Sequence, residues 1–357
     1  MTMSLRSRTT LLLRTALRPL LDPARRYRHA RLIHAVRVAL GLLCSIVLTT
    51  SLALPHGEWA SITLLVVIGG LQHHGNVRRK AAERAFGTAI GAAVGLAVIL
   101  QQSWLHWPLL SYLLVVLACG FCAYHAIGKG GYIALLSAIT ILIVAGHGGN
   151  AIADGLWRTL NVLLGIAVAL LFSFALPLHA TYSWRYQLAE LLRSCAQTYA
   201  AITGGTVPDQ VDLRRTMLAQ GALLVQLRSL MPSFAREAGI SMTQLEQVQH
   251  TLRIGISLLE VLAVSRPPLP DGTNSIAMAQ QLSGEHRHLR ELLLGMARAL
   301  KSGVLTDLSV PAALPPPSAL ADVPASQAAY RSLLLQLSVE FEHLRQHLVA
   351  IADRWNV

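Results

Sequence analysis

The sequence predicts an all-α membrane protein whose six transmembrane helices form two inverted three-helix units, followed by a cytoplasmic helical bundle. Of the 357 residues, 53% are apolar and 13% are charged, whereas soluble domains usually carry about 25% charged residues. The apolar residues of the first half form six runs, and those of the second half recur at helical spacing. We expect a basic amphipathic segment at 1–30, a transmembrane domain at 31–180 and a cytoplasmic helical domain at 181–357, with a Pro-rich linker near 305–325.

The first 30 residues are rich in arginine and do not read as a secretory signal. Arg14 follows the apolar run Leu11–Leu13 directly, and no small-residue cleavage site follows an apolar core. Leucines lie among arginines in residues 5–21. We therefore expect a basic amphipathic helix on the cytoplasmic face of the membrane.

Six apolar runs approach the length of about 20 residues that crosses a hydrocarbon core of ~30 Å. They are Val36–Leu54, Trp59–Leu71, Ala85–Gln101, Leu109–Ile127, Tyr132–Gly146 and Leu156–Leu178. The second and fifth runs are short, so we expect them to be half-embedded or extended by interfacial residues.

The placement of lysine and arginine predicts how these runs are oriented. Residues 1–37 hold nine arginines and one acid, and the loops at 72–84 and 125–131 add four more basic residues and Lys129 on the same side. The opposite loops hold no lysine or arginine: 55–58, 102–108 and 147–156. Both termini are therefore predicted to be cytoplasmic. Because the basic residues flank apolar runs, membrane orientation explains the net charge of +12, and we expect no nucleic-acid partner.

A weak internal repeat relates the two groups of three runs. The segment Ile62–Val67 resembles Ile139–Val144, and Arg84 and Arg158 are each followed seven residues later by a glycine, Gly91 and Gly165. Three crossings per group is an odd number, so the two groups must be inverted relative to each other. Inverted repeats often frame a transport pathway at their interface.

Candidate binding residues follow from this arrangement. Arg84 enters the membrane from the inner side and Arg158 from the outer side, and ionisable residues at membrane depth are costly and usually functional. The acids of this half lie at the ends of runs, which favours anions over cations as cargo. Further candidates are two basic residues at the inner mouth and two hydroxyls at the interface between the repeats: Arg37, Lys129, Thr63 and Thr140.

Two alternative interpretations concern packing and anchoring. Gly87, Gly91 and Gly95 share one helix face, and with Gly165 they are expected to let helices approach closely. Arg158 could instead be an interfacial anchor that extends toward water.

The sequence predicts no enzyme, metal or cofactor site. Cys119, Cys122 and His125 have metal-ligand spacing but lack the further ligands that a zinc site needs. Gly128–Gly131 lacks the spacing of a phosphate-binding loop, and no catalytic triad or carboxylate pair is apparent.

The second half predicts the core of a helical bundle. Four apolar stripes follow helical spacing. They begin at Trp184, Leu245, Leu289 and Tyr330 and end at Ile202, Leu259, Leu300 and Ile351. The last helix either packs in its own bundle or pairs with a partner subunit.

Residues 30–180 resemble the fusaric acid resistance-like family of membrane transporters, whose relatives include aromatic acid exporters and aluminium-activated malate transporters. The matching segments are Arg37–Leu40, Trp59–Thr63, Arg84–Gly91, and Arg158 with Gly165 and Pro177. The resemblance implies a six-helix membrane domain with a cytoplasmic helical domain, movement of organic anions that are often aromatic carboxylates, and a dimeric pore. This chain departs from it in having one membrane unit, which a homodimer would complement, and Asn161–Val162 where the other half has Gly87–Thr88.

We therefore expect a bacterial inner-membrane transporter that exports organic anions, with the lipid bilayer, the anion and a second copy as partners. An anion channel is one alternative. The other is a non-transporting scaffold whose cytoplasmic bundle recruits partners, in which the arginines would set topology alone.

Overall fold

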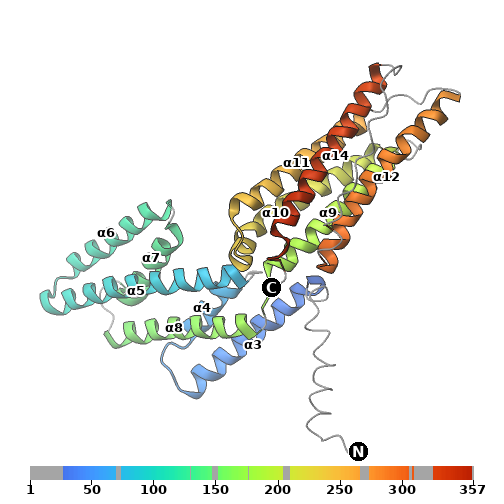
Figure 1. Cartoon of the computed structure of the whole chain (residues 1–357). Coiled ribbons are helices and arrows are strands. Elements are labelled where there is room, and N and C mark those ends of the chain that lie inside the picture. Colours follow the sequence, from blue (N-terminus) through green and yellow to red (C-terminus); the bar gives the residue numbers. More distant parts are fainter. Residues whose placement is uncertain are drawn as a thin grey trace, which may run out of the picture. The chain divides into compact units, whose positions relative to one another are not determined.

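The computed structural model describes residues 27–69, 74–128, 130–146, 152–175, 177–203, 210–265, 273–304, 308 and 325–355. These residues form helices and connecting turns, without any strand. The chain divides into two compact units: Arg28–Leu178, here called the membrane unit, and His179–Val357 together with Met1–Tyr27, here called the bundle unit (Figure 1). Three predicted features lie wholly or largely outside the described residues. They are the amphipathic segment, of which only the last residues are described, most of the Pro-rich linker, and Lys129.

Six helices make up the described part of the membrane unit. They are α3 (Ala30–Ser51), α4 (Glu58–Ile68), α5 (His74–Leu105), α6 (Pro108–Ala126), α7 (Gly131–Ala145) and α8 (Ile152–Ala175) (Figure 1). Four of them contain stretches long and apolar enough to cross a membrane, in α3, α5, α6 and α8. The other two, α4 and α7, have 11 and 15 residues. At about 1.5 Å per residue they measure roughly 17 and 23 Å, short of the ~30 Å core.

The prediction of a loop at 72–84 was wrong, because α5 begins at His74, eleven residues before the third predicted apolar run. The basic stretch before Ala85 is helix and not loop. It holds alanines and long charged side chains, which favour helix, and Arg79 pairs with Glu83 one turn later at 3.4 Å. Arg84 therefore lies ten residues inside a helix.

The helices of the membrane unit pack in a pattern that interleaves the first three with the last three. The most extensive contacts join α5 to α7 and α4 to α8, while α3 packs on α4 and α8, and α6 packs on α7 and α5. Between the two sets, α5 contacts α8. The pattern is unchanged when α3, α4 and α5 are exchanged for α6, α7 and α8.

Specific contacts give the relative directions of these helices. α3 and α4 run in opposite directions, since Ser45 bonds Ser61 at 3.1 Å and His34 bonds Gly69 at 3.2 Å. α5 and α7 run in the same direction, because successive glycines of α5 meet successive turns of α7. α5 and α8 run in opposite directions (Figure 1).

The described part of the bundle unit is a ring of helices around one apolar core. The helices are α9 (Ala180–Thr203), α10 (Gln210–Ala238), α11 (Met242–Val264), α12 (Thr273–Ser302) and α14 (Ala325–Ala352). Contacts run from α9 to α10, α11, α14 and α12 in turn and back to α9. Ser241 and Gln244 form a capping box that begins α11.

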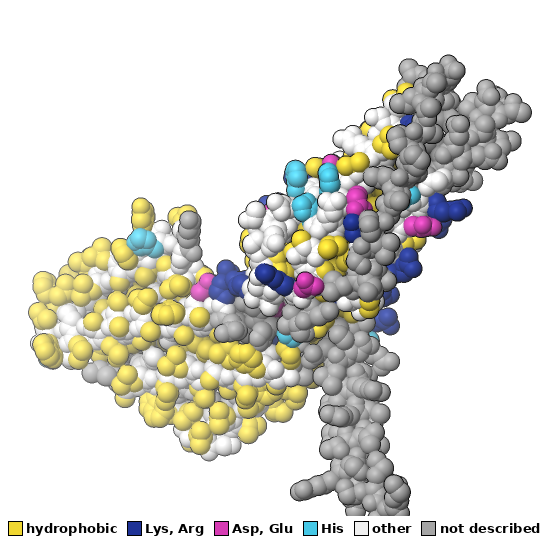
Figure 2. Space-filling view, viewed as in Figure 1, with side chains coloured by type: hydrophobic (Ala, Val, Ile, Leu, Met, Phe, Trp, Pro, Cys, Tyr) yellow, Lys and Arg dark blue, Asp and Glu magenta, His cyan; other side chains and the backbone are white. Residues whose placement is uncertain are grey.

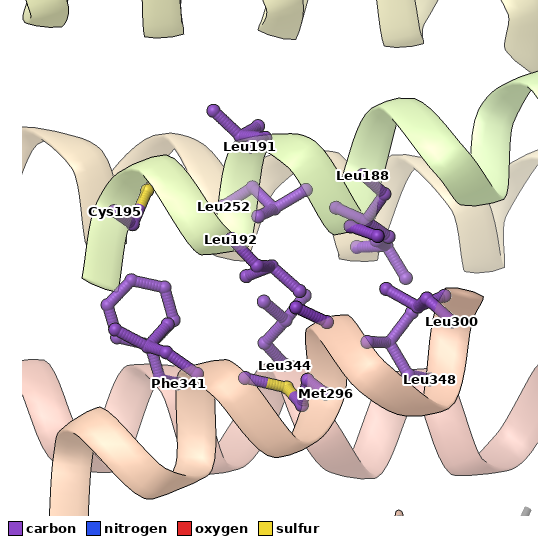
Figure 3. Close-up of a cluster of buried hydrophobic side chains, with 14 of the residues drawn as sticks. Leu188, Leu191, Leu192, Cys195, Leu252, Met296, Leu300, Phe341, Leu344 and Leu348 are labelled. Carbon is purple, nitrogen blue, oxygen red and sulfur yellow. The ribbon is translucent and has the colours of Figure 1, made fainter. Parts of the chain in front are cut away.

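All four predicted apolar stripes are buried in this core, so that prediction is confirmed. Figure 3 shows side chains of α9, among them Leu188 and Leu192, facing Met296 and Leu344. The last helix, α14, packs on α11 and α12 within its own bundle. The contribution of α10, through Leu227, Met231 and Phe234, was not predicted.

The surfaces of the two units differ in the side chains that they expose. The visible face of the membrane unit is covered with hydrophobic side chains, whereas the bundle unit shows lysine, arginine, acidic and histidine side chains among apolar ones (Figure 2). Exposed apolar residues of α3 and α6 include Leu43 at 58%, Leu109 at 68% and Phe121 at 67% exposure. Such a surface is suited to lipid rather than to water.

Candidate functional site

The glycines of α5 lie against the backbone of α7. A Cβ atom at Gly91 would lie 2.5 Å from the Ser137 carbonyl oxygen and 2.5 Å from Thr140 Cβ, and one at Gly87 would lie 2.7 Å from Leu136 Cβ. Real Cβ atoms do not approach so closely, so larger residues would force the two helices apart.

The backbones of α4 and α8 approach each other as closely as those of α5 and α7. A Cβ at Gly165 of α8 would lie 2.3 Å from the carbonyl oxygen of Ala60 on α4. In the repeat, Gly165 corresponds to Gly91 and Ala60 to Ser137. Both approaches are therefore made at corresponding places in the two halves.

Arg84 is buried in the helix core of the membrane unit. It is 3% exposed and lies near Tyr132 at the start of α7. Its Nε is buried and has no hydrogen-bond partner among the described residues. Among the described residues Arg84 forms no ion pair, and the adjacent Glu83 pairs with Arg79.

Two buried threonines also have hydroxyls without a hydrogen-bond partner among the described residues. Thr88, one turn after Arg84 on α5, and Thr63 on α4 are fully buried, and neither Oγ1 atom has a partner among the described residues. A buried polar group without a partner costs about 1–3 kcal/mol. Sequence reasoning missed Thr88, although its spacing of four residues from Arg84 puts both on one helix face.

Arg158 is half-buried on α8 and differs from Arg84 in its contacts. Its Nη1 donates a hydrogen bond of 2.6 Å to the carbonyl of Ile143, in the last turn of α7. The last four carbonyls of a helix have no partner within it, so this arginine caps α7. Its Nε is buried without a partner among the described residues.

Two further predicted site residues, Thr140 and Arg37, form hydrogen bonds within the protein. Thr140 donates to the Leu136 carbonyl of its own helix at 2.8 Å. Arg37, fully buried on α3, donates from Nη2 to His34 Nδ1 at 2.9 Å. His34 then has Nε2–H available for the Gly69 carbonyl at the end of α4, at 3.2 Å.

Asn161 is a second buried polar residue whose contacts the sequence did not predict. It is fully buried on α8, and its amide nitrogen donates to the carbonyls of Pro55 at 2.8 Å and Trp157 at 2.9 Å. Its Oδ1 has no partner within the described part of the chain. The amide therefore ties α8 to the loop between α3 and α4.

The separation of Arg84 and Arg158 follows from the register of α5 and α8. A Cβ at Gly155 would lie 3.7 Å from Ile99 Cδ1. Because the helices run in opposite directions, Arg158 is level with the residue twelve positions after Arg84. At 1.5 Å per residue the two arginines lie about 18 Å apart along the helix axis, less than the thickness of a hydrocarbon core.

The described residues contain no group of three His, Cys, Asp or Glu side chains that would hold a metal ion. Cys119 Sγ donates instead to the Ala138 carbonyl of α7 at 3.9 Å.

Similarity to known proteins agrees with a membrane protein. The chain is 29% identical over 277 residues to Inner membrane protein YeeA of Escherichia coli (strain K12), covering 78% of each chain. It is 30% identical over 124 residues to p-hydroxybenzoic acid efflux pump subunit AaeB of Escherichia coli O9:H4 (strain HS), which is 30% of this chain and 19% of that protein. Residues 42–172, which hold most of the membrane unit and the arginines and threonines of α4, α5, α7 and α8, match the model of the family described as Fusaric acid resistance protein-like, so this part of the chain is similar to that family.

Proposed function

We propose that this protein is a membrane transporter that exports organic anions, most readily aromatic carboxylates, along the core formed by α4, α5, α7 and α8. The observation that carries the proposal is Arg84, a cation that is 3% exposed and whose buried Nε has no partner in the part of the chain that the structure describes. A cation at such depth is costly. A bound carboxylate would neutralise its charge and accept its hydrogen bond.

Thr63 and Thr88 add open hydrogen-bond donors for the same anion. Carboxylate oxygens accept several hydrogen bonds each, and these hydroxyls are buried without partners. The surrounding side chains of α4 and α8 are apolar, including Leu64 and Val162. An aromatic ring attached to the carboxylate would find apolar contacts there, and the name of the AaeB relative, an efflux pump subunit for p-hydroxybenzoic acid, supports an aromatic acid as cargo.

The proposal includes a topology. Six crossings as two inverted units would place both termini in the cytoplasm of a bacterial cell, with Arg37, Arg84 and Lys129 toward the inner side and Arg158 toward the outer side. The exchange symmetry of the helix contacts and the alternating helix directions support this arrangement. The bundle unit would then be cytoplasmic, and a homodimer would supply a second membrane unit.

A scaffold that anchors the bundle unit is the second candidate. It is favoured by one observation: Arg158 caps α7, which is a structural role. In that case Arg84 would serve only to set topology, and no anion would move.

Efflux of labelled carboxylates from cells separates these candidates. The wild type would be compared with Arg84→Ala and Arg158→Ala at matched membrane levels, with Arg79→Ala, an exposed residue of the same helix, as the control. We expect wild-type efflux of aromatic acids, loss of at least about tenfold in the Arg84 variant, and normal efflux in the control. Absence of flux above background for every anion in the wild type would favour the scaffold.

A further inference from the structure

Arg84 and Arg158, which the predicted repeat relates to each other, differ in their hydrogen bonds. Arg158 bonds the carbonyl of Ile143 at the end of α7. The repeat relates Ile143 to Val66 of α4, yet Arg84 has no hydrogen bond to Val66 in the structure. The contact between α7 and α8 is also more extensive than the corresponding contact between α4 and α5.

The ends of α4 and α7 explain part of this difference. Each helix end carries unpaired carbonyls and the negative end of the helix dipole, which attract a cation. At α7 the group is Arg158 of α8. At α4 the Gly69 carbonyl is bonded instead by His34 of α3, whose ring is neutral because its Nδ1 accepts from Arg37, and Arg84 keeps its Nε open.

Among the described residues the two ends of the pathway differ in their open donors. At the α5 end these are Arg84 Nε and Thr88 Oγ1, and at the α8 end there is Arg158 Nε alone. At the α8 end the residue that corresponds to Thr88 is Val162, which has no donor, and the amide of Asn161 is already bonded to two carbonyls. In this conformation an anion meets two open donors at the α5 end, whereas at the α8 end it meets one, on an arginine whose Nη1 is bonded to Ile143.

We propose that the Arg158–Ile143 hydrogen bond is a latch that closes the α8 end of the pathway while the anion occupies Arg84 and Thr88. In the opposite state Arg158 leaves Ile143 and becomes available to the anion, and Arg84 caps the carbonyl of Val66. This rests on the proposed function and adds how access alternates: the two halves exchange conformations, as inverted repeats allow. The anion shifts the balance because it binds the two states differently.

The test measures access rather than flux. Val162→Cys and Thr88→Cys are paired reporters, each one turn after its arginine. They would be made in full-length protein whose four native cysteines are replaced by alanine or serine. A small, charged, membrane-impermeant methanethiosulfonate would be added to right-side-out and inside-out vesicles, and its labelling rate measured at each reporter.

We expect Cys at 162 to be protected from both sides while Arg158 is present. Arg158→Gln, which removes the charged cap, should raise its labelling rate at least about tenfold and lower the rate at position 88. Arg84→Gln should leave Cys at 162 protected. Arg158→Lys, which keeps a cation at the end of α7, should restore most of the protection.

The latch is overturned if position 162 labels equally with and without Arg158, or if both glutamine variants expose it equally. Matched melting temperatures of the Arg158→Gln and Arg158→Lys proteins would show that exposure is not unfolding, and exposure in both variants would again contradict the latch. Because labelling needs no transported anion, protection by Arg158 in a protein without efflux would contradict the proposed function alone.

Discussion

Arg84 in the membrane unit and Arg185 in the bundle unit are buried equally, each 3% exposed, yet their surroundings are opposite. Arg185 donates to the carbonyls of Leu300 at 3.1 Å and Trp355 at 3.2 Å, and its guanidinium lies over the rings of Tyr182 and Trp355. It holds together the ends of α12 and α14. Arg84, by contrast, has a buried Nε without a partner and forms no ion pair among the described residues. The comparison teaches that two arginines buried to the same extent can differ in whether their donors are satisfied within the protein, which burial alone does not reveal.

The largest expected effect is a loss of stability, and it should be greater for a glycine of the membrane unit than for one of the bundle unit. Gly165→Ala places a methyl group 2.3 Å from the Ala60 carbonyl, and we expect it to cost about 3 kcal/mol or more, because backbone must move. Gly255→Ala in the bundle unit meets the tip of the Phe341 ring at 2.9 Å, a side-chain atom that a small change of χ1 can move away, so we expect about 1 kcal/mol. Yield of monodisperse protein and melting temperature measure both, and equal losses would contradict the distinction.

Arg185→Met should destabilise the bundle unit strongly. It leaves the carbonyls of Leu300 and Trp355 without their donor, at a cost of about 3 kcal/mol. Denaturant unfolding of the full chain in detergent, followed by tryptophan fluorescence, measures it. Arg193→Met, an exposed position on the same helix, is the control, and an unchanged midpoint for Arg185→Met would remove the contrast with Arg84.

Unlike Arg185→Met, Arg84→Met should reduce efflux without reducing stability. Replacing a buried cation that lacks a partner by an apolar side chain of similar length should leave stability unchanged or raise it by about 1 kcal/mol, while efflux falls. Melting temperature and flux would be measured on the same preparations. A large loss of stability would show that Arg84 is structural.

The smallest effect concerns thiol chemistry in the two units. Burial raises the pKa of Cys195 in the bundle unit to about 12. At pH 8 its reactive thiolate is then roughly one part in ten thousand, and the fraction grows only as the pH rises toward 12. Alkylation of native protein followed by mass spectrometry should leave Cys195 unmodified until denaturant is added, and rapid native labelling would contradict the burial.

Much of the fold was predictable because the buried residues of a helix recur along the sequence at the helical period. The stripes from Trp184 to Ile202 and from Tyr330 to Ile351 are buried as their spacing predicts. The start of α5 was not, because a charged stretch reads equally as an amphipathic helix or as a polar loop. α10 was missed because its apolar residues are diluted by exposed ones such as Leu218 and Val225.

The site was predictable in its residue types and less so in their contacts. The repeat identified Arg84 and Arg158 as a pair, but a pattern of residues says nothing about which carbonyl an arginine bonds. The cap on Ile143 and the bonds of Asn161 join segments far apart in the chain. The sequence contains these residues, and only the fold brings them together.

The glycine approaches described above also determine what can move. Where backbones meet without side chains between them, two helices behave as one stiff piece. By this criterion α4 and α8, with α3 beside them, form one rigid body, and α5 and α7, with α6, form the other. Each body mixes helices from both halves of the chain, so the polypeptide passes between the bodies only at the α4–α5 and α7–α8 connections. The motion that this packing allows is a rocking of the two bodies about the α5–α8 contact.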